Sequence, residues 1–252
     1  MRIQFLRNAT LLLEWNNKRI LVDPMLGAKD SLDTVANAAN TLRNPLTELP
    51  VSEAALKELL TTLDAIIVTH RHRDHWDVTA QAILPKHIPV FCQPADVTAL
   101  TEQGFTQLHA VDTSVVWENI TVTRTGGQHG TGEIGKKMAP VSGFVLQEGP
   151  MTLYIAGDTI WCEEVNAAMD TFQPNYVVVN AGAAQFLQGD PITMTVADVI
   201  TTIQHPAKSK VIAVHMEAIN HCFLTRKALG AAVSAAGLSA IIPEQGEWIK
   251  LS

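Results

Sequence analysis

Four potential metal ligands lie within six consecutive positions of this sequence. They are His70, His72, Asp74 and His75. Directly before them, residues 65–68 form an apolar run rich in β-branched side chains, which is typical of a buried strand. Neutral imidazole nitrogens and carboxylate oxygens are ligands for divalent metals such as Zn²⁺, Mn²⁺ and Fe²⁺. Isolated histidines are usually surface or core residues, but three of them beside a carboxylate at a strand end predict a metal site.

Three further candidate ligands follow other predicted strands. They are His129, Asp158 and His215, which come after residues 120–125, 153–157 and 211–214. In α/β proteins, ligand-binding groups gather at the carboxyl ends of buried strands. Taken singly, each residue has a simpler explanation. His129 could be an ordinary loop residue, Asp158 could cap a helix, and His215 could be a buried residue that is hydrogen-bonded to the backbone. Taken together and in this order, they predict that four strand ends converge on one site.

The elements that must position these residues can be predicted from hydrophobic periodicity. Residues 3–22 alternate in hydrophobicity around an Asn-Asn turn, which predicts two or three antiparallel strands. Strand and helix then alternate over residues 52–111, hairpins follow over 115–156, strand and helix alternate again over 161–236, and a strand pair at 239–242 and 247–251 closes the chain. Two packed sheets with helices outside both would bury this pattern. We therefore predict one α/β domain over residues 1–252.

Residues 25–50 interrupt this regular pattern. The segment contains one Gly, one Ser, three Asn and two Pro, and a helix is possible only over a short stretch near residues 32–39. A long irregular segment in a compact domain is either disordered or functional. Because it comes shortly before the histidine cluster, we expect a pocket wall or a lid.

Composition narrows the classes of protein to which the chain can belong. Its formal net charge is −7 and no run of Lys and Arg is long enough to track a phosphate backbone, which disfavours a nucleic-acid partner.

The N-terminus lacks the pattern of a secretory signal, and no apolar stretch approaches the ~20 residues needed to cross a bilayer. The scattered Cys92, Cys162 and Cys222 fit free, buried thiols in a reducing compartment. We expect a cytoplasmic protein without a membrane partner. Whether the chain forms a homo-oligomer stays open.

The candidate ligands together resemble the ordered signature of a known superfamily. The residues that carry the resemblance are His70-x-His72-x-Asp74-His75, the glycine-flanked His129, Gly157-Asp158-Thr159 and the strand-end His215. This order is similar to that of the metallo-β-lactamase fold superfamily, across most of the chain. The resemblance implies a four-layered αββα sandwich. Within the superfamily, the short chain and its Asn8-Ala9-Thr10 and Val22-Asp23-Pro24 segments look most similar to cytoplasmic hydrolases of the L-ascorbate 6-phosphate lactonase-like group.

Carried over by motif position, the resemblance implies a dinuclear site. One metal would be held by His70, His72 and His129, and the second by Asp74, His75 and His215, with Asp158 bridging both. Zinc is the expected metal, with manganese or iron as alternatives. Two close cations can share a hydroxide, which would attack an ester, lactone or phosphodiester bond of a small metabolite. Asp74 and Asp158 would tune the hydroxide and pass its proton to the leaving group, and so are the predicted catalytic groups.

Two alternatives of the same fold stay open. Some members of the fold use one iron for thiol-linked dioxygenation, and a non-catalytic metal-binding protein is the other alternative. The complete ligand set favours the dinuclear hydrolase over both. Other polar residues near strand ends, namely Asn180, Glu217, Asn220 and His221, are candidates to face the metals and contact the substrate.

Overall fold

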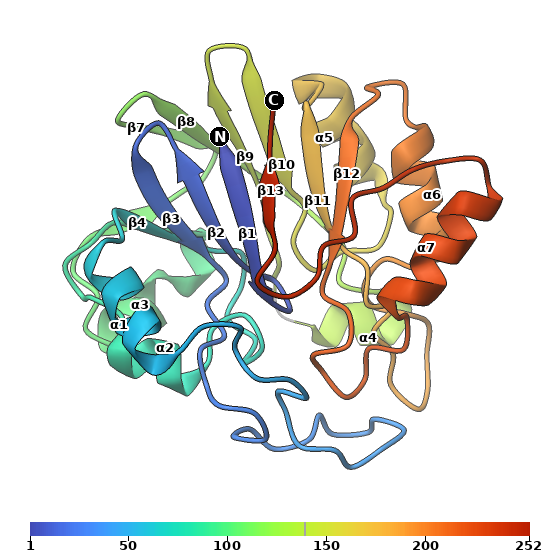
Figure 1. Cartoon of the computed structure of the whole chain (residues 1–252), viewed down its shortest axis with the longest axis horizontal. Helices are drawn as coiled ribbons and strands as arrows, with labels where there is room; N and C mark the ends of the chain where they lie inside the picture. The colour runs from blue at the N-terminus through green and yellow to red at the C-terminus, as the bar shows by residue number, and fades with distance from the viewer. Residues whose placement is uncertain (139) are drawn as a thin grey trace.

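Two β-sheets pack face to face in the computed structural model, and helices cover the outer face of each sheet (Figure 1). The structure describes residues 1–138 and 140–252. The first sheet has seven strands in the order β13-β1-β2-β3-β4-β5-β6, and the second has six in the order β12-β11-β10-β9-β8-β7. The arrangement is the αββα sandwich that the sequence predicts.

The elements have the following bounds. The strands of the first sheet are β1 (Arg2–Arg7), β2 (Thr10–Trp15), β3 (Lys18–Val22), β4 (Ala65–Val68), β5 (Val90–Cys92), β6 (Leu108–Ala110) and β13 (Trp248–Lys250). The strands of the second sheet are β7 (Ser114–Trp117), β8 (Ile120–Thr125), β9 (Gly143–Glu148), β10 (Met151–Ile155), β11 (Tyr176–Asn180) and β12 (Lys210–Val214). The helices are α1 (Glu53–Thr61), α2 (Val78–Ile83), α3 (Val97–Glu102), α4 (Gly132–Lys137), α5 (Glu163–Phe172), α6 (Val196–Gln204) and α7 (Arg226–Ala235).

Three apolar layers hold the sandwich together. Because successive side chains of a strand point to opposite faces, the central strands contribute to two layers each. Phe5, Phe91 and Phe144 lie in the layer between the sheets. Leu59 of α1 packs in the layer under the first sheet, and Val165 of α5 packs in the layer outside the second. The strands are therefore buried on both faces, and their ends are the places where polar groups can gather.

Backbone hydrogen bonds join the two sheets at the end where the candidate ligands lie. The amide of Ser142, just before β9, donates to the carbonyl of Thr69, just after β4 (3.3 Å). The amide of His215, just after β12, donates to the carbonyl of Asn8, between β1 and β2 (2.9 Å). The carboxyl ends of β4 and β12 are consequently each tied to the opposite sheet at this end of the sandwich.

Two predicted elements are wrong, and one was missed. Residues 239–242 do not pair with residues 247–251: Ile241 makes an isolated bridge to Ile212 of β12, while β13 pairs with β1 of the other sheet. The two segments separate because Ile249 joins the apolar layer between the sheets beside β1. Residues 32–39 form no helix, and a short helix, α4, lies instead inside the glycine-rich segment after His129.

The irregular segment 25–50 is tied to the body of the molecule at several points. The fully buried guanidinium of Arg7 donates to the carbonyls of Met25 and Gly27 (both 2.7 Å). Two hydrogen bonds join Asn44 to Asn220: the side-chain amide of Asn44 donates to Asn220 Oδ1, and the backbone amide of Asn220 donates to Asn44 Oδ1 (2.9 Å each). The segment therefore forms a hydrogen-bonded wall in this structure. Within residues 1–138 and 140–252, no helix combines the length and apolar character needed to cross a membrane.

Candidate metal centre

The structure brings all seven predicted ligands together. They form two groups, one of His70, His72 and His129, and one of Asp74, His75, Asp158 and His215. Within each group, one potential ligand atom per residue lies within 4.8 Å of every other. The four strand ends thus meet at one place in the structure, and metal binding by these residues stays a prediction.

The first group contains only imidazoles. His70 Nε2 and His72 Nδ1 are 2.9 Å apart. His129 Nε2 approaches from the second sheet and lies 3.5 Å from Asp158 Oδ2, which is also 3.9 Å from His70 Nε2. Three nitrogen donors with a carboxylate oxygen beside them are a suitable set for a divalent cation with an open position.

The second group combines imidazoles with carboxylates. His75 Nε2 and His215 Nε2 are 3.1 Å apart. Asp158 Oδ2 lies 3.2 Å from His75 Nε2, and Asp158 Oδ1 lies 3.4 Å from His215 Nε2. Asp74 Oδ2 lies 3.3 Å from His215 Nε2. The carboxylate of Asp158 is thus within reach of histidines from both groups.

Hydrogen bonds on the outer side of the rings determine which nitrogen faces inward. The hydroxyl of Thr69 donates to Asp23 Oδ2 (2.7 Å), so it can accept from His70 Nδ1 (3.1 Å). Asp23 Oδ2 also accepts from His75 Nδ1 (2.8 Å), and the carbonyl of Ile192 accepts from His129 Nδ1 (2.7 Å). Because Nδ1 of His70, His75 and His129 is bonded on the outer side, Nε2 of each ring faces the centre, an arrangement found in metal sites whose ligands have ordered outer partners.

Sequence reasoning missed three of the residues that orient the ligands. Asp23 holds His75 and Thr69, Asn8 donates to Asp74 Oδ2 (3.3 Å), and the thiol of Cys222 lies 3.6 Å from His215 Nδ1. Asp23 directly follows β3, so the rule that polar residues at strand ends form sites would have found it. Cys222 was expected only as a small buried hydrophobe, and no pattern in the chain indicates its contact with His215.

The backbone at the site is held in a sparsely populated conformation. His215 has φ 68°, Asp23 φ 42° and Asn8 φ 54°. Residues other than glycine seldom adopt the left-handed region, and such outliers persist where the surrounding structure requires them. Gly157 also has a positive φ (72°), and a Cβ there would lie 2.7 Å from the Ser142 carbonyl. The turn that presents Asp158 therefore needs glycine.

The electrostatics of the two groups differ. Burial lowers the pKa of His70 well below its ordinary value, and burial also lowers the pKa of His72 and His129. Burial alone would likewise lower the pKa of His75, but the charges of Asp158, Asp74 and Asp23 outweigh it and raise that pKa to about 10. The second group is therefore a site with a surplus of negative charge, which attracts a cation.

The carboxylates of the second group are ionised. Burial would raise the pKa of Asp158, but the charges of His215 and His75 outweigh it and hold the pKa well below its usual range. The pKa of Asp74 is lowered in the same way, against its burial, by His75 and His215. Inward-facing ring nitrogens, ionised carboxylates and near-complete burial make these residues a good fit for divalent metal cations.

A pocket gives access to both groups. It has a volume of about 410 Å³. Its lining includes the ligands His72, Asp74, His129 and Asp158 together with Val35, Arg71, Arg73, Met138 and His221. Val35 belongs to the irregular segment 25–50, which therefore forms part of the pocket wall as expected; closure as a lid stays a prediction.

The four candidate substrate residues have different surroundings. His221 lines the pocket. Asn180 instead donates to Asp158 Oδ1 (2.7 Å) and so orients that carboxylate. Glu217 accepts from the backbone amide of Arg226 (3.0 Å) and pairs with its guanidinium (2.7 Å), at the start of α7. Asn220 binds the segment 25–50. Of these four residues, His221 is the one that lines the pocket, and substrate binding stays a prediction.

Comparison with known proteins identifies the family. Residues 18–216 match the model of the beta-lactamase superfamily domain. UPF0173 protein YddR of Bacillus subtilis is 37% identical over 256 residues, covering 98% of each chain. The chain belongs to the UPF0173 family of metal-dependent hydrolases. A UPF0173 metal-dependent hydrolase of Saccharolobus solfataricus is 26% identical over 188 residues, covering 72% of this chain and 71% of the relative.

Two solved structures resemble this UPF0173 chain over its whole length. The isothiocyanate hydrolase from Delia radicum gut bacteria has a TM-score of 0.93 and 35% identity, covering 100% of this chain and 99% of that one. A possible metal-dependent hydrolase from Veillonella parvula has a TM-score of 0.94 and 33% identity, with the same coverage. The chain therefore has the metallo-β-lactamase fold and is a metal-dependent hydrolase. Its place in the lactonase-like subgroup stays a prediction.

Proposed function

We propose that this chain is a dinuclear metal-dependent hydrolase of a small molecule. The observation that carries the proposal is the position of Asp158, whose two carboxylate oxygens lie 3.2–3.5 Å from histidines of both ligand groups. A carboxylate so placed can bridge two cations. His70, His72 and His129 would hold one, and Asp74, His75 and His215 the other. Zinc is the proposed metal, because imidazole and carboxylate ligands suit it.

The side chains of the protein would transfer the proton and orient the metal ligands. Two divalent cations, when bound, would supply Lewis acidity and a hydroxide at neutral pH. Asp74, ionised and held by the side chain of Asn8, can accept a proton and return it to the leaving group. Asn180 keeps Asp158 in one orientation through its hydrogen bond. Asp74 and Asp158 are therefore the proposed catalytic groups.

His221 is the proposed substrate-binding residue. Burial lowers its pKa to about 4, so the imidazole is neutral at pH 7. Its ring lies beside that of Phe186, with 5.6 Å between the centroids. Within the described part of the chain, its buried Nδ1 has no hydrogen-bond partner. A neutral imidazole in the pocket wall can donate one hydrogen bond to an oxygen or sulfur of the substrate.

The substrate class follows from the attack that such a site supports. An ester, a lactone or a phosphodiester offers an electrophilic carbon or phosphorus and an oxygen that gains charge during the attack. A second candidate is the isothiocyanate group, whose central carbon is also electrophilic. The solved isothiocyanate hydrolase, 35% identical over the full length of this chain, favours this second candidate.

A substrate panel tests the proposal. The protein would be loaded with zinc or manganese and assayed on a neutral ester, a lactone, a phosphodiester and an isothiocyanate. We expect turnover of at least one, with kcat/KM reduced at least about 10²–10³-fold in His72→Ala. The matched control is His87→Ala, since His87 is exposed and outside both ligand groups. Undiminished turnover in His72→Ala, or one iron per chain with oxygen uptake on a thiol, contradicts the proposal.

A further inference from the structure

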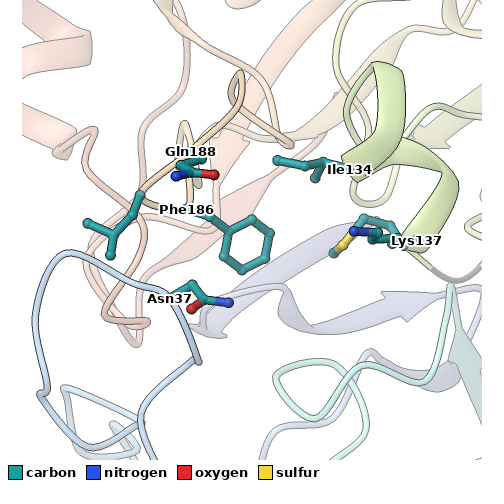
Figure 2. A pocket seen from close by; sticks show the side chains of 7 residues that line it. Asn37, Ile134, Lys137, Phe186 and Gln188 are labelled. Atoms are coloured by element: carbon teal, nitrogen blue, oxygen red, sulfur yellow. The ribbon is translucent and has the colours of Figure 1, made fainter.

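A second cavity lies beside the metal pocket. Its volume is about 400 Å³. Figure 2 shows the side chains around it, with the Phe186 ring between Asn37 on one side and Ile134 and Lys137 of α4 on the other. Met138 and Leu187 also line it. We call this cavity the side chamber.

The side chamber adjoins the metal pocket through shared walls. Met138 lines both cavities. The Phe186 ring lies in the side chamber and stacks against His221, which lines the metal pocket, at an interplanar angle of 29°. A molecule whose reacting group lies at the metal centre could therefore extend a substituent past His221 and Met138 into the side chamber.

The walls of the side chamber are tied to one another. The backbone amide of Leu187 donates to the carbonyl of Asn37 (2.8 Å). The hydroxyl of Thr131, at the start of α4, donates to the carboxylate of Asp190 (3.2 Å). Gly189 packs so closely on Ile134 that an added Cβ would lie 2.1 Å from its Cδ1. The cavity is thus a defined feature between three chain segments.

The chemistry of the side chamber is mainly apolar. Ile134, Met138, Phe186 and Leu187 supply its apolar side chains. Leu187 is 67% exposed, which costs free energy unless something covers it. A single exposed leucine is unremarkable, but here it lies beside an aromatic ring in a concave surface next to a reactive centre. The polar lining consists of Asn37, Lys137 and Gln188 and is the smaller part of the surface, so an apolar group fits the side chamber better than a sugar or a nucleotide.

We propose that the substrate of this hydrolase carries an apolar arm, an alkyl or aryl group, that binds in the side chamber while the reacting group lies at the metal centre. This inference rests on the proposed function and narrows it to small molecules with a hydrophobic substituent. Phe186 and Leu187 are then specificity-determining residues. Burial of the arm lowers the free energy of the bound state in proportion to the apolar area removed from water.

Binding of alkyl hydroxamates to the zinc-loaded protein tests the proposal without turnover. The hydroxamate group binds divalent metals, and its tail can be lengthened from acetyl to octanoyl. By calorimetry, we expect Kd to fall by up to about fourfold for each methylene that enters the side chamber. A Kd independent of tail length overturns the proposal.

Two variants and a control locate the tail. Leu187→Asp introduces a charge into the side chamber and should weaken octanoyl hydroxamate at least about tenfold, with acetohydroxamate unchanged. In Ile134→Trp, the larger side chain should fill part of the side chamber, so Kd should stop falling at a shorter tail length. Leu42→Asp is the matched control, because Leu42 is also exposed (57%) but lies outside the side chamber. Equal effects of Leu187→Asp and Leu42→Asp would place the tail elsewhere.

A carboxylate-terminated series separates an apolar arm from an acidic one. If tails ending in a carboxylate bind more tightly than alkyl tails of equal length, and Lys137→Met removes the difference, the arm is anionic and the proposal is wrong. Failure of the proposed function has a different signature: no turnover on any substrate of the panel, with the dependence of Kd on tail length intact.

Discussion

The two halves of the metal centre use the same imidazole donor in opposite electrostatic settings. Around His70, His72 and His129, burial prevails and lowers the pKa of each ring. Around His75 and His215, burial is outweighed by carboxylates, and the pKa values rise, that of His75 to about 10. The carboxylates beside a buried histidine therefore decide whether its ring stays neutral.

This difference has a consequence for metal binding. A metal must find its histidine ligand without a proton. At pH 7 the first group offers three neutral rings, whereas in the second group a metal must displace protons that the carboxylates also attract. The same negative charge favours the metal once the protons leave. We expect the first group to bind with little dependence on pH and the second with a strong one.

Removal of Asp158 is expected to have the largest effect, because it is the group that joins the two halves. In Asp158→Ala, the histidines of both groups lose a carboxylate 3.2–3.5 Å away. We expect kcat/KM to fall at least about 10²–10³-fold and the zinc content to fall below two per chain. Activity assays and metal analysis measure this, with circular dichroism to check folding. Asp158→Asn, which keeps the shape, should behave alike; full zinc content in both would refute the bridging role.

Substitution of Asp23 tests the second half more than the first. Asp23→Asn weakens the partner of His75 Nδ1 directly, whereas it reaches His70 only through the hydroxyl of Thr69. We expect the affinity of the second zinc to fall about 10–100-fold, with a smaller change in the first. Competitive titration with a chelator resolves the two affinities. Weakening of both zinc ions to the same degree would show that the halves are not independent.

The pH dependence of metal binding sharpens the comparison. His75 and His215 have raised pKa values, and their Nε2 atoms are 3.1 Å apart, so one proton can lie between them. The second zinc should therefore release about one proton at pH 7, and its affinity should fall about tenfold per pH unit as the pH is lowered. The first zinc should release close to none. Calorimetry in buffers of different ionisation enthalpy counts the protons. Equal release by both ions would contradict the assignment.

The fold and the ligand set could be predicted because both leave local marks in the chain. Residues 65–68 are apolar and His70 follows them, and the same pattern recurs before Asp158 and His215. Hydrophobic runs show where strands lie, and polar residues at their ends show where a site can form. α4 was missed because its residues, glycine-rich and without an apolar face, carry no helical pattern.

Contacts between segments that are distant in the sequence produce no local sequence pattern from which they could be predicted. The hydrogen bond of Asp23 to His75, the contact of Cys222 with His215 and the pairing of β13 with β1 each join residues far apart in sequence. The contact of Asn180 with Asp158 was missed for the same reason. The sequence placed Asn180 at a strand end, but the direction of its side chain depends on Asp158.

By itself, the sequence determined the type of fold and the chemistry within reach, because strand periodicity and the identity of the ligands are properties of short segments. Only the tertiary structure decided that the two ligand groups have different electrostatic surroundings, and which residues orient the ligands. It also placed the side chamber between α4 and Phe186, beside the metal pocket. These properties depend on distances across the sandwich, since electrostatic and packing interactions act between neighbours in space and not along the chain.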